Sequence, residues 1–80
     1  MVKIYTKANC TQCRFTKTRM VQKGIPFDDI FVDVENDTET LQKLTNDGAK
    51  SFPVVYDMND NLLFSGFMPS LIDKLGVENV

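Results

Sequence analysis

The opening segments of the chain restrict its possible folds most strongly. Residues 2–6, VKIYT, form a β-rich run typical of a strand covered on both faces. Residues 11–23 suit a helix that ends at Gly24, and residues 28–34, DDIFVDV, predict a second strand. Such a strand-helix-strand unit predicts a parallel pair of strands with a right-handed crossover. Residues at spacings of three and four predict the buried helix face: Cys13, Thr16, Met20 and Val21.

The remaining segments complete an α/β order. Residues 36–48 open with helix-capping residues and acids and stop at a glycine, so they predict a second helix. Residues 52–57 and 61–66 are short strand-like runs around a turn, which is typical of a β-hairpin. Residues 68–76 have Pro69 near the first helical position and predict a third helix. The expected order over residues 1–80 is β-α-β-α-β-β-α, in one domain.

Charge and hydropathy narrow the classes of partner. The formal net charge is −2 and the pI is about 4.8, so neither a nucleic acid nor an anionic membrane is an expected partner. The N-terminal residues lack the apolar run of a signal peptide, and no run approaches the length of a membrane span. We therefore expect a cytoplasmic protein. We also expect it to act as a monomer.

Both cysteines of the chain lie in the segment ANCTQC, residues 8–13. Cys10 is expected just before the first helix and Cys13 in its first turn, where unpaired N–H groups and the helix dipole favour an anion. A thiolate is such an anion, and it is the reactive form of cysteine. Lys7 and Arg14 add positive charge nearby. In a reducing compartment, this spacing beside a strand-helix-strand unit indicates thiol–disulfide exchange.

Other interpretations of the cysteines stay open at this point. Both could be small apolar core residues in a module that only binds partners. A structural zinc site needs four ligands, and with two cysteines and no histidine it would require a shared site in a dimer or carboxylate ligands. A non-enzymatic metal or iron–sulfur carrier, dimeric through shared cysteines, is a further alternative. We expect no metal and no cofactor other than the cysteine pair. The lack of histidine also excludes a Ser-His-Asp or Cys-His arrangement.

Three segments together resemble a known family. YTKANCTQC, then SFPVV, then FSGFMPSLIDKL are similar to the NrdH-type redoxins, a glutaredoxin-like branch of the thioredoxin superfamily. The resemblance covers essentially the whole chain. It implies the thioredoxin/glutaredoxin fold, with a four-stranded mixed sheet flanked by three helices. It also implies a dithiol–disulfide electron carrier that accepts electrons from thioredoxin reductase and passes them to class Ib ribonucleotide reductase.

The resemblance also implies roles for individual residues. Cys10 would be the attacking nucleophile and Cys13 the resolving thiol. Pro53 matches the family's cis-proline, and cis bonds are essentially confined to X–Pro. The partner-binding residues implied in this way are Lys7, Thr11, Gln12, Phe52, Pro53, Ser65, Gly66 and Phe67. Phe67 or Met68 should be partly exposed near the cysteines, as an apolar shelf for a partner's tail.

Residues 64–70, FSGFMPS, depart from the common family pattern W-S-G-F-R-P-D. Phe64, Met68 and Ser70 replace tryptophan, arginine and aspartate, so an ionic link across this loop is missing; either the loop is mobile or other groups hold it. A glutathione-dependent glutaredoxin is the alternative function. Phe67 stands where glutathione binders have a second glycine, whereas Lys7 matches a lysine that can meet a glutathione carboxylate.

Overall fold

The computed structural model describes residues 1–78, and the side chains of residues 1–76. Its elements are β1 (Val2–Thr6), α1 (Thr11–Gln22), β2 (Phe27–Phe31), α2 (Thr38–Asn46), β3 (Val54–Asp57), β4 (Leu62–Ser65) and α3 (Pro69–Glu78). The strands form one sheet in the order β2-β1-β3-β4. β1 is parallel to β2 and antiparallel to β3, and β3 is antiparallel to β4. The predicted order of elements and the mixed sheet are confirmed.

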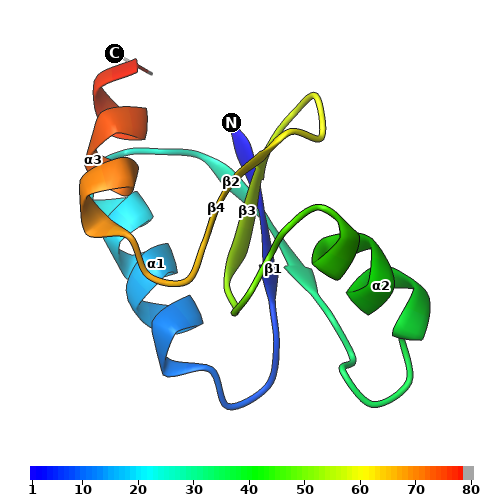
Figure 1. Cartoon of the computed structure of the whole chain (residues 1–80). Helices are drawn as coiled ribbons and strands as arrows, with labels where there is room; N and C mark the ends of the chain where they lie inside the picture. Colours follow the sequence, from blue (N-terminus) through cyan, green and yellow to red (C-terminus); the bar gives the residue numbers. More distant parts are fainter. Residues whose placement is uncertain (79–80) are drawn as a thin grey trace.

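The helices cover both faces of the sheet (Figure 1). α1 and α3 lie together on one face, and α2 lies on the other. β1 is an inner strand, which explains why its residues are buried or half-buried along their whole length. Among the described residues, no helix combines the length and the apolar composition that a membrane span requires.

Local signals in the sequence set the helix ends. Asp37 caps α2, where its side chain accepts a hydrogen bond from the Thr40 backbone N–H at 3.1 Å. α3 begins at Pro69, one residue after the predicted start, because proline suits the first helical position. α1 ends at Gln22, and Gly24 reverses the chain with a φ of 70°.

The core has one cluster on each face of the sheet. Between the sheet and the α1–α3 layer lie Val2, Ile4, Met20, Ile25, Val55, Phe64 and Ile72. Leu44 of α2 packs with Val54 and Tyr56 on the other face. The Tyr56 hydroxyl donates a hydrogen bond to Asp47 Oδ2 at 2.6 Å, which ties the end of α2 to β3. On the first face, Arg19 of α1 donates two hydrogen bonds to the Asp73 carboxylate of α3, at 3.0 and 2.9 Å.

Two details of the sequence prediction are wrong. Val21 was expected on the buried face of α1, but it is 69% exposed. The helix turns about 100° per residue, so the residue after Met20 points away from the sheet. The second strand was expected to reach residue 34, but β2 ends at Phe31. Val32 is buried just after the strand, and Val34 is 42% exposed, because β1 offers no partner beyond Thr6.

Candidate active site

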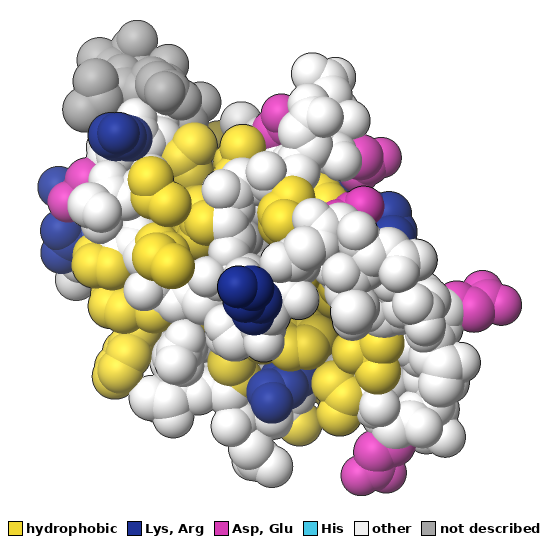
Figure 2. All heavy atoms as spheres, viewed as in Figure 1, with side chains coloured by type: hydrophobic (Ala, Val, Ile, Leu, Met, Phe, Trp, Pro, Cys, Tyr) yellow, Lys and Arg dark blue, Asp and Glu magenta, His cyan; other side chains and the backbone are white. Residues whose placement is uncertain are grey.

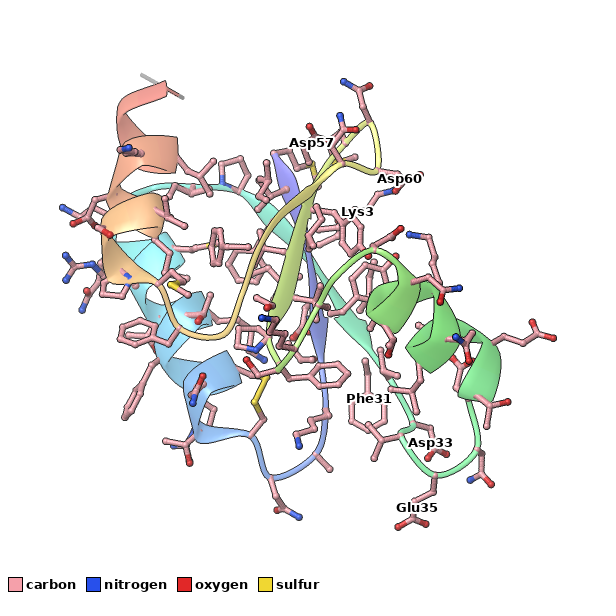
Figure 3. The ribbon with its side chains drawn as sticks, in the orientation of Figure 1. Lys3, Phe31, Asp33, Glu35, Asp57 and Asp60 are labelled. Carbon is pink, nitrogen blue, oxygen red and sulfur yellow. A yellow bond between two sulfur atoms is a disulfide. The ribbon has the colours of Figure 1, made fainter. Side chains whose placement is uncertain are left out.

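The two cysteines form a disulfide at the start of α1. Figure 3 shows it as the yellow bond at the N-terminal end of that helix. Cys10 is the N-cap residue, and its Sγ accepts a hydrogen bond from the Cys13 backbone N–H at 3.1 Å. Cys10 is half-buried, whereas Cys13 is only 2% exposed. The start of α1 therefore carries one accessible cysteine, Cys10, and one buried cysteine, Cys13.

A groove on one side of the disulfide carries most of the site's charge. It is lined by Thr6, Lys7, Asn9, Cys10, Thr11, Cys13, Arg14, Lys17, Asp29 and Phe31. Lys17 Nζ and Thr6 Oγ1 each donate a hydrogen bond to the Asp29 carboxylate at 2.8 Å. Partial burial alone would raise the pKa of Asp29, but these two hydrogen bonds hold it below its usual range. Asp29 thus offsets the charge of Lys17, and Lys7 and Arg14 give this groove its positive charge.

A second groove runs along the other side of Cys10 and leads to the segment before β3. Its lining comprises Lys7, Cys10, Thr11, Gln12, Lys50, Ser51 and Phe52. The Phe52–Pro53 peptide bond is cis, as predicted. Lys7 Nζ lies 5.7 Å from the centroid of the Phe52 ring, so the lysine joins the two grooves by a cation–π contact.

The loop between β4 and α3 is held in place by neutral groups, one of which, Gln12, belongs to α1, the helix that carries the cysteines (the cysteine helix). The Phe67 backbone N–H donates to Gln12 Oε1 at 3.1 Å, and the Gly66 N–H donates to the Pro53 carbonyl at 2.7 Å. Ser65 Oγ accepts a hydrogen bond from the Lys50 N–H at 3.3 Å. Of the two possibilities raised by the departure from W-S-G-F-R-P-D, the second is therefore realised: other groups replace the missing ionic link.

The apolar residues of this loop are partly exposed beside the cysteine helix. Phe67 is 36% exposed and Met68 is 44% exposed, as predicted. The Phe67 ring packs against the Phe15 ring of α1 at a centroid distance of 6.0 Å, and Phe15 is itself 56% exposed. In Figure 2, hydrophobic and basic side chains are exposed together on the lower part of this face. By contrast, Lys3, Asp57 and Asp60 lie at the opposite end of the sheet from the disulfide (Figure 3).

Four of the predicted residues line the grooves beside the cysteines: Lys7, Thr11, Gln12 and Phe52. Gly66 and Phe67 reach this site through Gln12, whereas Pro53 and Ser65 are hydrogen-bonded to Gly66 and Lys50. The structure also adds several residues that the sequence argument missed. Thr6, Lys17, Asp29 and Phe31 share the first groove with the cysteines, and Lys50 and Ser51 share the second. One signal was available for Asp29, because two consecutive aspartates are unusual in a strand. In the described part of the chain, no group of three or more metal-binding side chains is close enough to hold an ion.

A disulfide at the start of the first helix, together with a cis-proline just before β3 whose neighbour Phe52 shares a groove with Cys10, defines a thiol–disulfide oxidoreductase of the thioredoxin fold. Comparison with known proteins agrees with this class. The family model described as Glutaredoxin matches residues 2–62. The glutaredoxin-like protein NrdH of Lactococcus lactis is 37% identical over 75 residues, which cover 94% of this chain and 99% of that protein.

Two further relatives give the same result. The glutaredoxin-like protein NrdH of Salmonella typhimurium is 38% identical over 74 residues, covering 92% of this chain and 86% of that protein. The solved structure of NrdH-redoxin from Escherichia coli superimposes with a TM-score of 0.76 at 35% identity, covering 92% of each chain. The chain therefore belongs to the glutaredoxin family, in its NrdH-type branch.

Proposed function

We propose that this protein carries electrons from thioredoxin reductase to class Ib ribonucleotide reductase, as a cytoplasmic monomer whose redox group is the Cys10–Cys13 pair. The observation that carries the proposal is the difference between the two sulfur environments. Cys10 is accessible and its Sγ accepts a backbone N–H, whereas Cys13 is sealed one turn further along α1. The N–H and the positive end of the helix favour a thiolate at Cys10.

In the proposed reaction, the Cys10 thiolate attacks one sulfur of a partner disulfide. The bond between the partner's sulfurs breaks, a Cys10–partner mixed disulfide forms, and the leaving sulfur takes up a proton. The Cys13 thiolate then attacks Cys10 Sγ, which closes the Cys10–Cys13 disulfide and releases the second partner thiol. Two electrons and two protons have passed to the partner, and thioredoxin reductase returns the pair to the dithiol.

The surroundings of Cys10 support docking of an extended cysteine-containing segment. Phe67 and Met68 offer an exposed apolar shelf on one side of the cysteine helix. Lys7 lines both grooves that meet at Cys10, and the second groove leads to Phe52, next to the cis-proline. Thr11 and Gln12 lie between the cysteines, and Gln12 fixes the backbone of Phe67.

The choice of thioredoxin reductase over glutathione rests on the same loop. The Phe67 side chain adds bulk beside the cysteine helix, and its ring packs on Phe15. The related Escherichia coli NrdH-redoxin is described as having a thioredoxin-like activity profile. Both observations favour a protein reductase as the electron donor.

The test is NADPH-coupled reduction of a protein disulfide with two reducing systems in parallel: thioredoxin reductase, or glutathione with glutathione reductase. We expect turnover with thioredoxin reductase and less than about a tenth of that rate with glutathione. Cys10→Ser should abolish turnover, and Cys13→Ser should leave a mixed disulfide with the partner, detectable by mass. Normal turnover of Cys10→Ser would exclude the mechanism, and turnover with glutathione alone would make the protein a glutathione-dependent glutaredoxin. Reduction of the oxidised C-terminal tail of class Ib ribonucleotide reductase then tests the acceptor.

A further inference from the structure

Thr16 on α1 has an unusual polar environment. Its side chain is fully buried, and among the described side chains its Oγ1 is the buried nitrogen or oxygen that has no hydrogen-bond partner. Buried hydroxyl groups are nearly always hydrogen-bonded, because they lose water without compensation otherwise. A helical threonine usually satisfies its hydroxyl on a carbonyl three or four residues earlier, and Thr16 does not. This hydroxyl therefore calls for an explanation.

The position of Thr16 relative to Cys13 provides one. Cys13 and Thr16 are three residues apart, so they are neighbours on one face of α1, and both are sealed from solvent. Side chains on a helix lean toward its N-terminus, so the Thr16 side chain lies over the turn that contains Cys13. In the oxidised protein, the disulfide holds Cys13 Sγ toward Cys10, at the end of the helix.

We propose that the Thr16 hydroxyl donates a hydrogen bond to Cys13 Sγ when the disulfide is reduced, and so favours the dithiol form. On reduction by an external dithiol, the Cys10–Cys13 bond breaks and two electrons and two protons enter the pair, while the external dithiol becomes a disulfide. Cys13 Sγ is then free to turn about its Cα–Cβ bond toward Thr16. A sulfur that gains a hydrogen bond only in the reduced state shifts the equilibrium toward that state. Thr16 is thus a positioning residue for the resolving thiol.

As a result, the oxidised and the reduced state differ in which polar groups have a hydrogen-bond partner. In the oxidised state, Cys10 Sγ accepts the Cys13 N–H while the Thr16 hydroxyl is unsatisfied. In the reduced state, both sulfurs have a donor, Cys10 from the backbone and Cys13 from Thr16. The burial of Cys13 and Thr16 strengthens the effect, because water does not compete for either group.

The experiment compares Thr16→Val, which removes the hydroxyl at constant shape, with Thr16→Ser, which keeps it. Thr18→Val is the matched control, since Thr18 is an exposed threonine on the same helix. Each protein is equilibrated in dithiothreitol redox buffers, and the oxidised fraction is measured by alkylation and mass spectrometry. We expect Thr16→Val to lower the equilibrium constant for reduction about tenfold, which corresponds to a potential about 30 mV more negative. Thr16→Ser and Thr18→Val should stay within about twofold of wild type.

A second measurement separates this role from ordinary packing. Urea unfolding of the oxidised and the reduced protein should show that Thr16→Val stabilises the oxidised form relative to the reduced form, whereas a packing role would shift both forms alike. An unchanged equilibrium constant for Thr16→Val would overturn the proposal, and so would an equal loss in Thr16→Ser. Because the buffer is a small dithiol, the result does not depend on which protein is the physiological electron donor.

Discussion

Replacing Gly66 by alanine should lower the free energy of unfolding by about 1.5–3.5 kcal/mol. Gly66 lies between Ser65 and Phe67 in the loop beside the cysteine helix, and its φ is 82°. An alanine in this left-handed region costs roughly 1–2 kcal/mol, because its Cβ approaches the following carbonyl oxygen. The N–H of Gly66 also donates to the Pro53 carbonyl at 2.7 Å, so residue 66 cannot change its φ without loss of this hydrogen bond.

A steric contribution adds to the conformational one. A Cβ at Gly66 would lie 3.0 Å from Ser51 Oγ and 3.5 Å from Gln12 Oε1. Ser51 is exposed, so its hydroxyl can rotate away. A side chain forced from its preferred rotamer costs of order 0.5–1.5 kcal/mol. We therefore expect the contact to contribute less than the backbone conformation.

Two comparisons separate these contributions in urea unfolding at pH 7. Gly24 has a φ of 70°, and a Cβ there would meet nothing within 4 Å, so Gly24→Ala should show the conformational cost alone, about 1–2 kcal/mol. Adding Ser51→Ala to Gly66→Ala should recover the excess over Gly24→Ala. If Gly66→Ala cost no more than Gly24→Ala, or if the excess survived the removal of Ser51, the steric argument would be refuted. Turnover with thioredoxin reductase should also fall, because Gly66 sets the position of Phe67.

Two further predictions concern ionisable groups that hold the helices. Tyr56→Phe should cost about 1 kcal/mol in unfolding free energy, since the Asp47 carboxylate loses the hydroxyl that donates to it. It should also raise the pKa of Asp47, which the Tyr56 and Lys43 hydrogen bonds hold below its usual range; an unchanged Asp47 titration by NMR would contradict this. Hydrogen bonds from Arg19 likewise lower the pKa of Asp73, so its stabilising effect is complete above the ordinary aspartate pKa of about 4 and is lost as the pH falls through the lower folded value. Asp73→Asn should therefore destabilise the protein at pH 7, and the difference in thermal midpoint should close in acid; a difference independent of pH would exclude the ionic explanation.

The order of elements and the chemistry of the site could be predicted from the sequence. Both depend on local signals that need no knowledge of distant contacts. The cysteines three residues apart, placed between a strand and a helix, already indicated a redox pair at a helix start. Capping by Asp37 and the helix start at Pro69 are likewise set by residues within one turn. The cis bond before Pro53 was predicted from the family resemblance and not from the residue itself, since most X–Pro bonds are trans.

The contacts between residues far apart in the chain could not be predicted from the sequence. The hydrogen bond from Phe67 to Gln12 joins residues 55 positions apart, and the Arg19–Asp73 pair joins residues 54 apart. No periodicity encodes such contacts, because they depend on how helices and strands pack. The same reason explains the exposure of Val21 and the early end of β2, which follow from the helix orientation and from the length of β1. The unsatisfied Thr16 hydroxyl also emerged only from packing, since a threonine on an apolar helix face gives no sign of it in sequence.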